Sequence, residues 1–100
     1  MTDTEPDLDA VYARSERIVG RKIADEYVLV PIVGKGAEVD SIFNLNRVGA
    51  FIWERLDGAS SGRQIVRALL ERFDVTAVRA EGDYRQFLAQ LLSIRAVRGA

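Results

Sequence analysis

The stretch that decides the fold is Ile42-Phe43-Asn44-Leu45-Asn46-Arg47-Val48-Gly49-Ala50-Phe51-Ile52-Trp53-Glu54-Arg55-Leu56-Asp57-Gly58. Asn46 has the short polar side chain typical of a helix N-cap. An apolar stripe with helical spacing follows it, made of Val48, Phe51, Ile52 and Leu56. The stripe closes at Asp57-Gly58, where a glycine suits the position after a helix C-terminus. The stretch therefore predicts a strand that leads directly into a first helix.

Three segments that end at this helix have the composition of strands. Residues 17–24 are rich in β-branched side chains, and residues 27–33 form an apolar run of strand length. Asp25-Glu26 separates the two, which predicts a hairpin that turns there. After a glycine-rich loop, residues 39–45 form the third strand. Strands joined by short loops pair antiparallel, so we expect a meander whose first and third strands are its edges.

Two further helices follow the first. Ser61 and Gln64 have the spacing of a capping box. The apolar stripe behind them is Ile65, Leu69 and Phe73. The last helix carries the apolar set Tyr84, Phe87, Leu88, Leu91 and Leu92. Its N-cap is either Thr76 or Asp83, and we prefer Thr76 because good helix formers follow it and one interior glycine costs only about 1 kcal/mol. Residues 94–100 are expected to form a loose C-terminal segment.

The whole chain is the size of one domain. It has 100 residues, of which 48% are apolar, and this is enough for a compact core. Residues 1–16 lack hydrophobic periodicity, are acidic and contain Pro6, so we expect a disordered acidic arm ahead of a folded domain over residues 17–100. Three strands followed by three helices define an α+β fold for that domain.

Composition argues against an enzyme. The sequence contains no cysteine and no histidine. Their absence removes thiol nucleophiles, imidazole bases and the usual ligands of zinc, haem and iron–sulfur clusters. The remaining carboxylates, lysines, tyrosines and hydroxyls form no catalytic constellation. We therefore expect a binding protein without a metal, a cofactor or catalytic residues.

The N-terminus differs from that of an exported protein. Residues 1–9 carry four acidic side chains and no basic one, which is the opposite of the cationic start of a signal peptide. No apolar run approaches the roughly 18 residues that a membrane helix needs. The sequence thus predicts a cytoplasmic protein that does not interact with a membrane.

The string Leu-Asn-x-x-Gly-Ala-x-Ile-Trp-x-x-Leu-Asp-Gly over residues 45–58 resembles the signature of the PqqD-like family, which is named for the pyrroloquinoline quinone pathway. Other matching segments are Leu29-Val30-Pro31, Gln64-Ile65-Val66, Phe73-Asp74-Val75 and Tyr84-Arg85-Gln86-Phe87-Leu88. The similarity covers about residues 17–97. The family is known as the recognition element of pathways for ribosomally made, post-translationally modified peptides. The resemblance implies a winged-helix-like fold that performs no catalysis.

The resemblance also implies a peptide partner and a place for it. Family members bind the leader segment of a precursor peptide and deliver it to a modifying enzyme, often one of the radical S-adenosylmethionine type. The leader adds to the third strand and packs against the third helix. The groove implied in this chain consists of Ser41, Ile42, Phe43, Asn44, Leu45, Arg85, Leu88, Ala89 and Leu92. An edge strand with Ile42 on one face and Phe43 and Leu45 on the other suits strand addition.

Several of these residues also have a structural interpretation. Ile42 suits an ordinary strand residue or a dimer contact equally well, and Leu88 and Leu92 suit core packing better than a groove. Arg85 lies by default on a solvated face, although it is placed to pair with an acidic leader residue. Trp53 is expected to anchor the packing between helices. The oligomeric state expected is a monomer or a strand-swapped dimer.

Two other functions compete with peptide recognition. A winged helix that binds DNA would use the bases of the second and third helices, which are Arg63, Arg67, Arg72, Arg79 and Arg85. Acidic residues interrupt these sets and the acidic arm would repel phosphate, so no nucleic-acid partner is expected. The remaining alternative is a small structural subunit of an enzyme complex.

Overall fold

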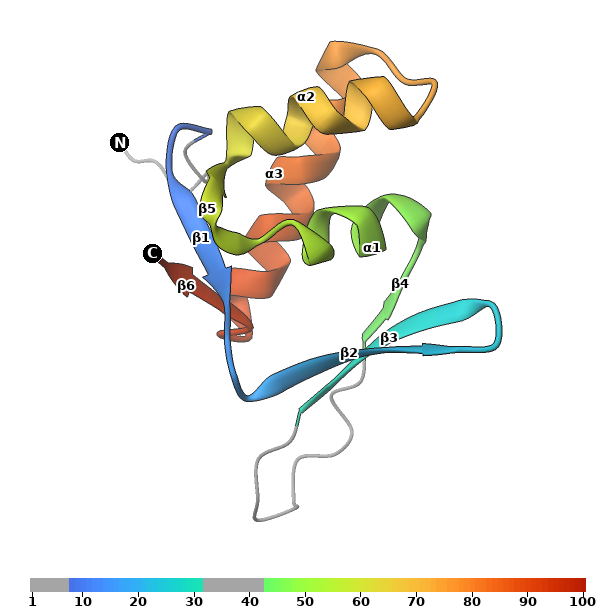
Figure 1. Cartoon of the computed structure of the whole chain (residues 1–100), viewed down its shortest axis with the longest axis vertical. Coiled ribbons are helices and arrows are strands. Elements are labelled where there is room, and N and C mark those ends of the chain that lie inside the picture. The colour runs from blue at the N-terminus through green and yellow to red at the C-terminus, as the bar shows by residue number, and fades with distance from the viewer. Residues whose placement is uncertain (1–7, 32–42) are drawn as a thin grey trace.

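The computed structural model describes residues 8–31 and 43–100. This part of the chain forms two three-stranded antiparallel sheets and three helices (Figure 1). The sheet of order β5–β1–β6 contains β1 (Val11–Arg14), β5 (Asp57–Ser61) and β6 (Val97–Gly99). The sheet of order β2–β3–β4 contains β2 (Ile18–Ile23), β3 (Glu26–Pro31) and β4 (Phe43–Leu45). The helices are α1 (Arg47–Glu54), α2 (Gly62–Arg72) and α3 (Ala77–Ser93).

The predicted meander and α+β fold class are confirmed. β2 pairs with β3 from Ile18 opposite Pro31 to Ile23 opposite Glu26, and β4 pairs with β3. The hairpin turns at Ala24 and Asp25, one residue before the predicted position, and Ala24 adopts a φ of 57°. Of the predicted third strand, residues 39–42 lie outside the described residues.

The predicted disordered arm is wrong for its described part. β1 lies within the predicted arm and pairs with both β5 and β6. Leu8 is only 5% exposed and joins the hydrophobic core, while its carbonyl accepts a hydrogen bond from the backbone N–H of Arg63 at 2.8 Å. The ordered domain therefore includes residues 8–16. Residues 1–7 of the predicted arm lie outside the described residues.

The predicted loose C-terminal segment is also wrong. β6 pairs with β1, so that Arg14 lies opposite Val97. Ala96 and Val97 are buried in the core. The backbone N–H of Ala96 donates to the carbonyl of Leu91, which turns the chain back from the end of α3. β1 and β6 are therefore both held by strand pairing with partners that are remote in the sequence.

The helix starts follow the predicted caps. The Asn46 side chain accepts a hydrogen bond from the N–H of Gly49 at 2.7 Å. Ser61 and Gln64 form both hydrogen bonds of the capping box. Thr76 caps α3, which runs without interruption through Gly82. α1 ends at Glu54, two residues before Leu56, which is the last residue of the predicted apolar stripe. Residues 57–61 then form β5.

A single apolar core joins the helices to both sheets. Its fully buried large side chains are Leu29, Ile52, Leu56, Ile65, Leu69, Tyr84, Leu88 and Leu91. Trp53 is 3% exposed, as expected for a packing anchor. Gly20 lies under this ring, and a Cβ there would come within 2.7 Å of Trp53 Nε1 and of the Tyr27 hydroxyl. The hairpin can therefore approach α1 closely only because residue 20 has no side chain.

Candidate functional site

β4 is the edge of the β2–β3–β4 sheet. Phe43 lies opposite Leu29, and Leu45 lies opposite Tyr27. Within the described residues no other strand pairs with β4. Its outer backbone groups thus form a short row of donors and acceptors that a further strand can use.

The side chains of β4 alternate between the core and the surface. Phe43 and Leu45 are half-buried and pack against the core, whereas Asn44 is exposed. A strand added at this edge would meet the backbone of all three residues and the accessible parts of the two apolar side chains. Ser41 and Ile42, which the sequence also assigned to the groove, lie outside the described residues.

Gly49 brings α3 close to the end of β4. A Cβ at this buried glycine would lie 3.5 Å from Leu45 Cβ and 3.6 Å from Phe87 Cε1. Leu45 and Phe87 therefore flank the same point on α1. A Cβ at position 49 would be in ordinary van der Waals contact with both side chains, so β4 and α3 each pack closely on α1 at this glycine.

The four α3 residues of the predicted groove occupy different environments. Leu88 is fully buried, so it belongs to the core and is not accessible to a peptide in this conformation. Arg85 is half-buried, Ala89 is exposed, and Leu92 is 36% exposed. These three side chains are not on the flank of α3 that carries Phe87, because about 100° per residue places each of them about 140° to 160° away from it.

The structure thus adds two residues that the sequence reasoning did not assign to the groove. Phe87 approaches the same point on α1 as Leu45, and Gln90 follows on the same flank, about 60° from Phe87 around the helix. Phe87 is half-buried and Gln90 is exposed. The glycine at position 49 does not identify this flank from the sequence alone, because Gly82 also lies inside a helix and a Cβ there would meet nothing within 4 Å.

The arginines of the DNA-binding alternative do not form one free stripe. Arg63 Nε donates to Asp9 Oδ1 at 3.0 Å, and Arg79 lies 3.5 Å from Asp83 Oδ1. Asp9 belongs to the segment that was expected to be a disordered arm, and in the structure it instead covers a base of α2. Two of the five candidate bases thus already face carboxylates.

Among the described residues, the titratable groups with perturbed pKa values are two tyrosines and one aspartate. Burial raises the pKa of Tyr84 to about 12, and neighbouring Tyr12 adds to this effect. Burial and the charge of Glu54 raise the pKa of Tyr27. The backbone N–H groups of Ala59 and Ser60 lower the pKa of exposed Asp57. Within residues 8–31 and 43–100, His, Cys, Asp and Glu form no cluster of three or more that could hold a metal.

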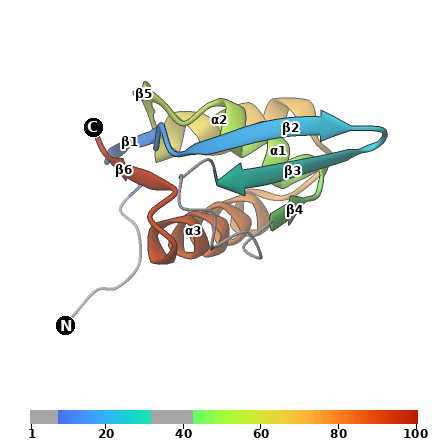
Figure 2. The same ribbon diagram turned by 90° about the horizontal axis from the view of Figure 1, so that it is seen from below.

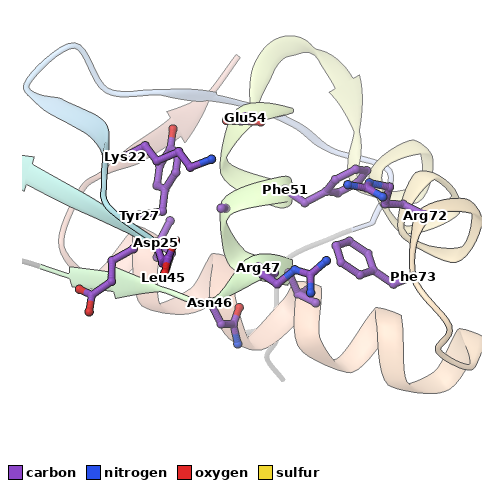
Figure 3. A pocket seen from close by; sticks show the side chains of 13 residues that line it. Lys22, Asp25, Tyr27, Leu45, Asn46, Arg47, Phe51, Glu54, Arg72 and Phe73 are labelled. Atoms are coloured by element: carbon purple, nitrogen blue, oxygen red, sulfur yellow. The ribbon is translucent and has the colours of Figure 1, made fainter.

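Apart from the open edge of β4, the surface has a hollow of about 930 Å³ between the hairpin tip and α1 (Figure 3). Its lining comes from the hairpin, from the start and outer face of α1 and from the end of α2, and it consists of Lys22, Asp25, Glu26, Tyr27, Leu45, Asn46, Arg47, Val48, Ala50, Phe51, Glu54, Arg72 and Phe73. Leu45 alone is shared with the predicted groove. The open edge of β4 and this hollow are therefore distinct features that meet at one residue.

These features define a small, winged-helix-like α+β domain with an open strand edge beside its last helix. A family model described as coenzyme PQQ synthesis protein D (PqqD) matches residues 26–97. The chain belongs to the PqqD family, which confirms the resemblance found in the sequence.

A solved structure described as "TbiB1 in Complex with the TbiA(beta) Leader Peptide" matches with a TM-score of 0.70 and 28% sequence identity. The match covers 88% of this chain and 96% of the other. No curated protein sequence matches this chain. None of the helices in the described part of the chain is long and apolar enough to cross a membrane.

Proposed function

We propose that this chain binds the leader segment of a ribosomally made precursor peptide by strand addition to β4, and that it presents the leader to a modifying enzyme. The observation that carries the proposal is the open edge of β4 beside α3. The chain is also similar over most of its length to TbiB1, whose structure was determined with a leader peptide. In this proposal the chain contributes binding and no catalytic step.

The edge limits how tightly a leader is held. Each backbone hydrogen bond contributes a net stabilisation of about 0.5 to 1.5 kcal/mol. Ordering a flexible leader costs several kcal/mol, so side-chain contacts must supply much of the affinity. A micromolar dissociation constant, about −8 kcal/mol, is the expected result. Such an affinity allows the leader to leave once the enzyme has acted.

The proposed binding surface has two walls. Phe43, Asn44 and Leu45 form the strand wall, which Ser41 and Ile42 extend as the sequence predicts. The helix wall is the α3 flank that carries Phe87 and Gln90, since this flank approaches the same point on α1 as Leu45. Arg85, Ala89 and Leu92 form the alternative helix wall that the sequence suggested.

The cellular setting is part of the proposal. The chain acts in the cytoplasm, where precursor peptides are synthesised, and needs no cofactor of its own. Its partner is a modifying enzyme of the radical S-adenosylmethionine type. The chain binds as a monomer or a strand-swapped dimer, and it does not bind nucleic acid.

A labelled-peptide titration tests the strand addition. The probes are fluorescent synthetic peptides that tile the short reading frames flanking the gene. We expect at least one peptide to bind the wild-type chain with micromolar affinity and to lose about tenfold or more of it with Ile42→Arg. The amide NMR signals of Phe43, Asn44 and Leu45 should shift on binding. Binding that survives Ile42→Arg without shifts on β4 would contradict the proposal.

Two adjacent exposed positions on α3 distinguish the helix walls. Gln90→Arg changes the flank of Phe87, whereas Ala89→Arg changes the flank of Arg85 and Leu92. Both variants add the same side chain to an exposed position, so both should fold normally. We expect Gln90→Arg to lower the affinity for the peptide and Ala89→Arg to leave this affinity unchanged. The reverse result would assign the wall to Arg85, Ala89 and Leu92.

A further inference from the structure

The hollow between the hairpin tip and α1 faces away from the proposed leader-binding surface. Arg47, Phe51 and Glu54 project from α1 into it, whereas Gly49 faces Leu45 and Phe87. Helical geometry places these three side chains about 140° to 160° from Gly49. A molecule in the hollow and a leader on β4 would thus bind different sides of α1 and meet only at Leu45.

One end of the hollow combines aromatic rings with arginines. The rings of Phe51 and Phe73 meet edge to face with 5.4 Å between centroids. Arg55 stacks over Phe51 at 3.6 Å, and the Arg72 guanidinium lies 5.7 Å from the centre of Phe73. Figure 3 shows Phe51, Arg72 and Phe73 together on one side of the α1 ribbon. This end presents an apolar surface with positive charge at its rim.

The opposite end of the hollow is mainly negative. It is formed by the hairpin tip and the last turn of α1, where Asp25, Glu26 and Glu54 outnumber the single base Lys22. Within the described residues, neither Arg47 and Arg72 at the first end nor these acids form an ion pair. The hollow is therefore a dipolar surface whose charged side chains form no ion pair within the described part of the chain.

We propose that this hollow is a docking surface for a segment of a second protein in which a bulky apolar side chain is flanked by an acidic residue on one side and a basic residue on the other. The apolar side chain packs on Phe51 and Phe73, the carboxylate pairs with Arg47 and Arg72, and the base faces Asp25 and Glu54. The lining has charges of both signs around the rings of Phe51 and Phe73, and a protein segment is the kind of partner that can present both signs beside an apolar side chain. A nucleic acid is disfavoured because its phosphates would meet the acids of the hairpin tip.

The identity of the second protein rests on the proposed function. A chain that presents a leader to an enzyme must contact that enzyme while β4 remains occupied. The hollow meets this requirement because it lies on a different side of α1. Its natural occupant is therefore a segment of the modifying enzyme.

A displayed library of random dodecapeptides tests the chemistry of this surface. The library is selected on the full chain, and the recovered peptides are titrated against Arg47→Glu/Arg72→Glu. The matched control is Arg21→Glu/Arg67→Glu, which has the same total charge and changes exposed arginines outside the hollow. We expect recovered peptides with an apolar residue between an acid and a base, and a loss of about tenfold or more in affinity for the first variant only.

Several outcomes would overturn the docking surface. The proposal is wrong if the selected peptides bind the wild type and Arg47→Glu/Arg72→Glu equally. It is also wrong if the selected peptides contain no acidic residue beside the apolar one. Peptides lost with Ile42→Arg would have bound β4 instead. Weaker self-association of Arg47→Glu/Arg72→Glu in sedimentation would assign the hollow to a second copy of the chain.

The test is independent of leader recognition. If the tiled leader peptides fail to bind but the selected peptides respond to Arg47→Glu/Arg72→Glu, the proposed function fails and the docking surface stands. If leader peptides bind and no selected peptide distinguishes that variant from its control, the docking surface fails and the proposed function stands.

Discussion

The two sheets of the molecule differ in how they are assembled. β5–β1–β6 gathers strands from the beginning, the middle and the end of the chain, whereas β2–β3–β4 is built from consecutive strands. In the first sheet β1 is paired on both sides and Arg14 donates to the carbonyls of Trp53 and Glu54 at the end of α1. The second sheet extends away from the helices, and Figure 2 shows the tip of its hairpin projecting beyond them.

This difference suggests that the β5–β1–β6 sheet mainly determines stability, whereas the β2–β3–β4 sheet mainly determines binding. The β5–β1–β6 sheet ties residues 8–14 and 96–99 to the core, so changes there should alter the free energy of unfolding. The β2–β3–β4 sheet offers an open edge at β4 and the hollow below its hairpin tip, so surface changes there should alter binding with little effect on stability. Substitutions in each sheet test this assignment, because those in β5–β1–β6 should change stability and surface substitutions in β2–β3–β4 should change binding.

The largest effect on stability is expected from Leu8→Ala. Leu8 is almost fully buried and holds the start of the chain against the core. Its truncation leaves a cavity and should cost about 2 to 3 kcal/mol in the free energy of unfolding, measured with urea. The control in the other sheet is Ile23→Ala, since Ile23 is 55% exposed and its loss should change stability by less than about 0.5 kcal/mol. Equal small effects of both variants would show that the chain start does not support the fold.

A pair of glycine substitutions gives the next largest effects, with opposite signs. A Cβ at Gly62 would lie 2.7 Å from the ring of Tyr84, which is fully buried and cannot move aside. Gly62→Ala should therefore lower stability by about 1 to 3 kcal/mol. A Cβ at Gly82, in the interior of α3, would meet nothing within 4 Å, so Gly82→Ala should raise stability by up to about 1 kcal/mol. Thermal unfolding measures both, and changes of the same sign would contradict the packing at Gly62.

The same division explains which parts of the fold could be predicted from the sequence. The hairpin and the helix caps are encoded by residues within a few positions of each other, such as Ser61 with Gln64. β1, β5 and β6 are three to five residues long and show no alternating pattern of their own. They form because remote backbone groups complete one another's hydrogen bonds, as in the N–H of Gly62 donating to the carbonyl of Ala10. Short-range patterns carry no information on such partners.

The site was predictable to a similar degree. The edge position of β4 follows from the order of the strands. Phe43 and Leu45 were expected to be core residues as well as groove residues, and in the structure both are half-buried against the core. The flank of α3 that faces β4 depends on the rotation of the helix about its axis. The apolar stripe of α3 does not fix this rotation closely enough, because Phe87 and Leu92 both belong to it and face different sides. The short distance from Gly49 to Phe87 supports the proposal that the flank of Phe87 forms the helix wall.

At neutral pH the smallest effects are expected from substituting one tyrosine in each region, and the two variants should differ only at alkaline pH. Tyr84 packs against Gly62 beside the β5–β1–β6 sheet, and burial holds its pKa at about 12. The pKa of an unfolded tyrosine is about 10, so the folded state retains the phenolic proton over this range. The contribution of Tyr84 to stability is therefore complete below pH 10 and is lost as the pH rises from about 10 to about 12.

Tyr84→Phe should remove this loss of stability between about pH 10 and pH 12. The Tyr84 hydroxyl has no hydrogen-bond partner among the described residues, so its deletion should cost little at neutral pH. Tyr27→Phe is the counterpart in the hairpin, where the side chain is only half-buried and its pKa is raised by burial and by Glu54. Urea unfolding between pH 8 and pH 12 should show a flatter profile for Tyr84→Phe than for Tyr27→Phe. An unchanged slope in Tyr84→Phe would mean that the ring is reached by solvent and that the β5–β1–β6 side of the core is looser than its packing indicates.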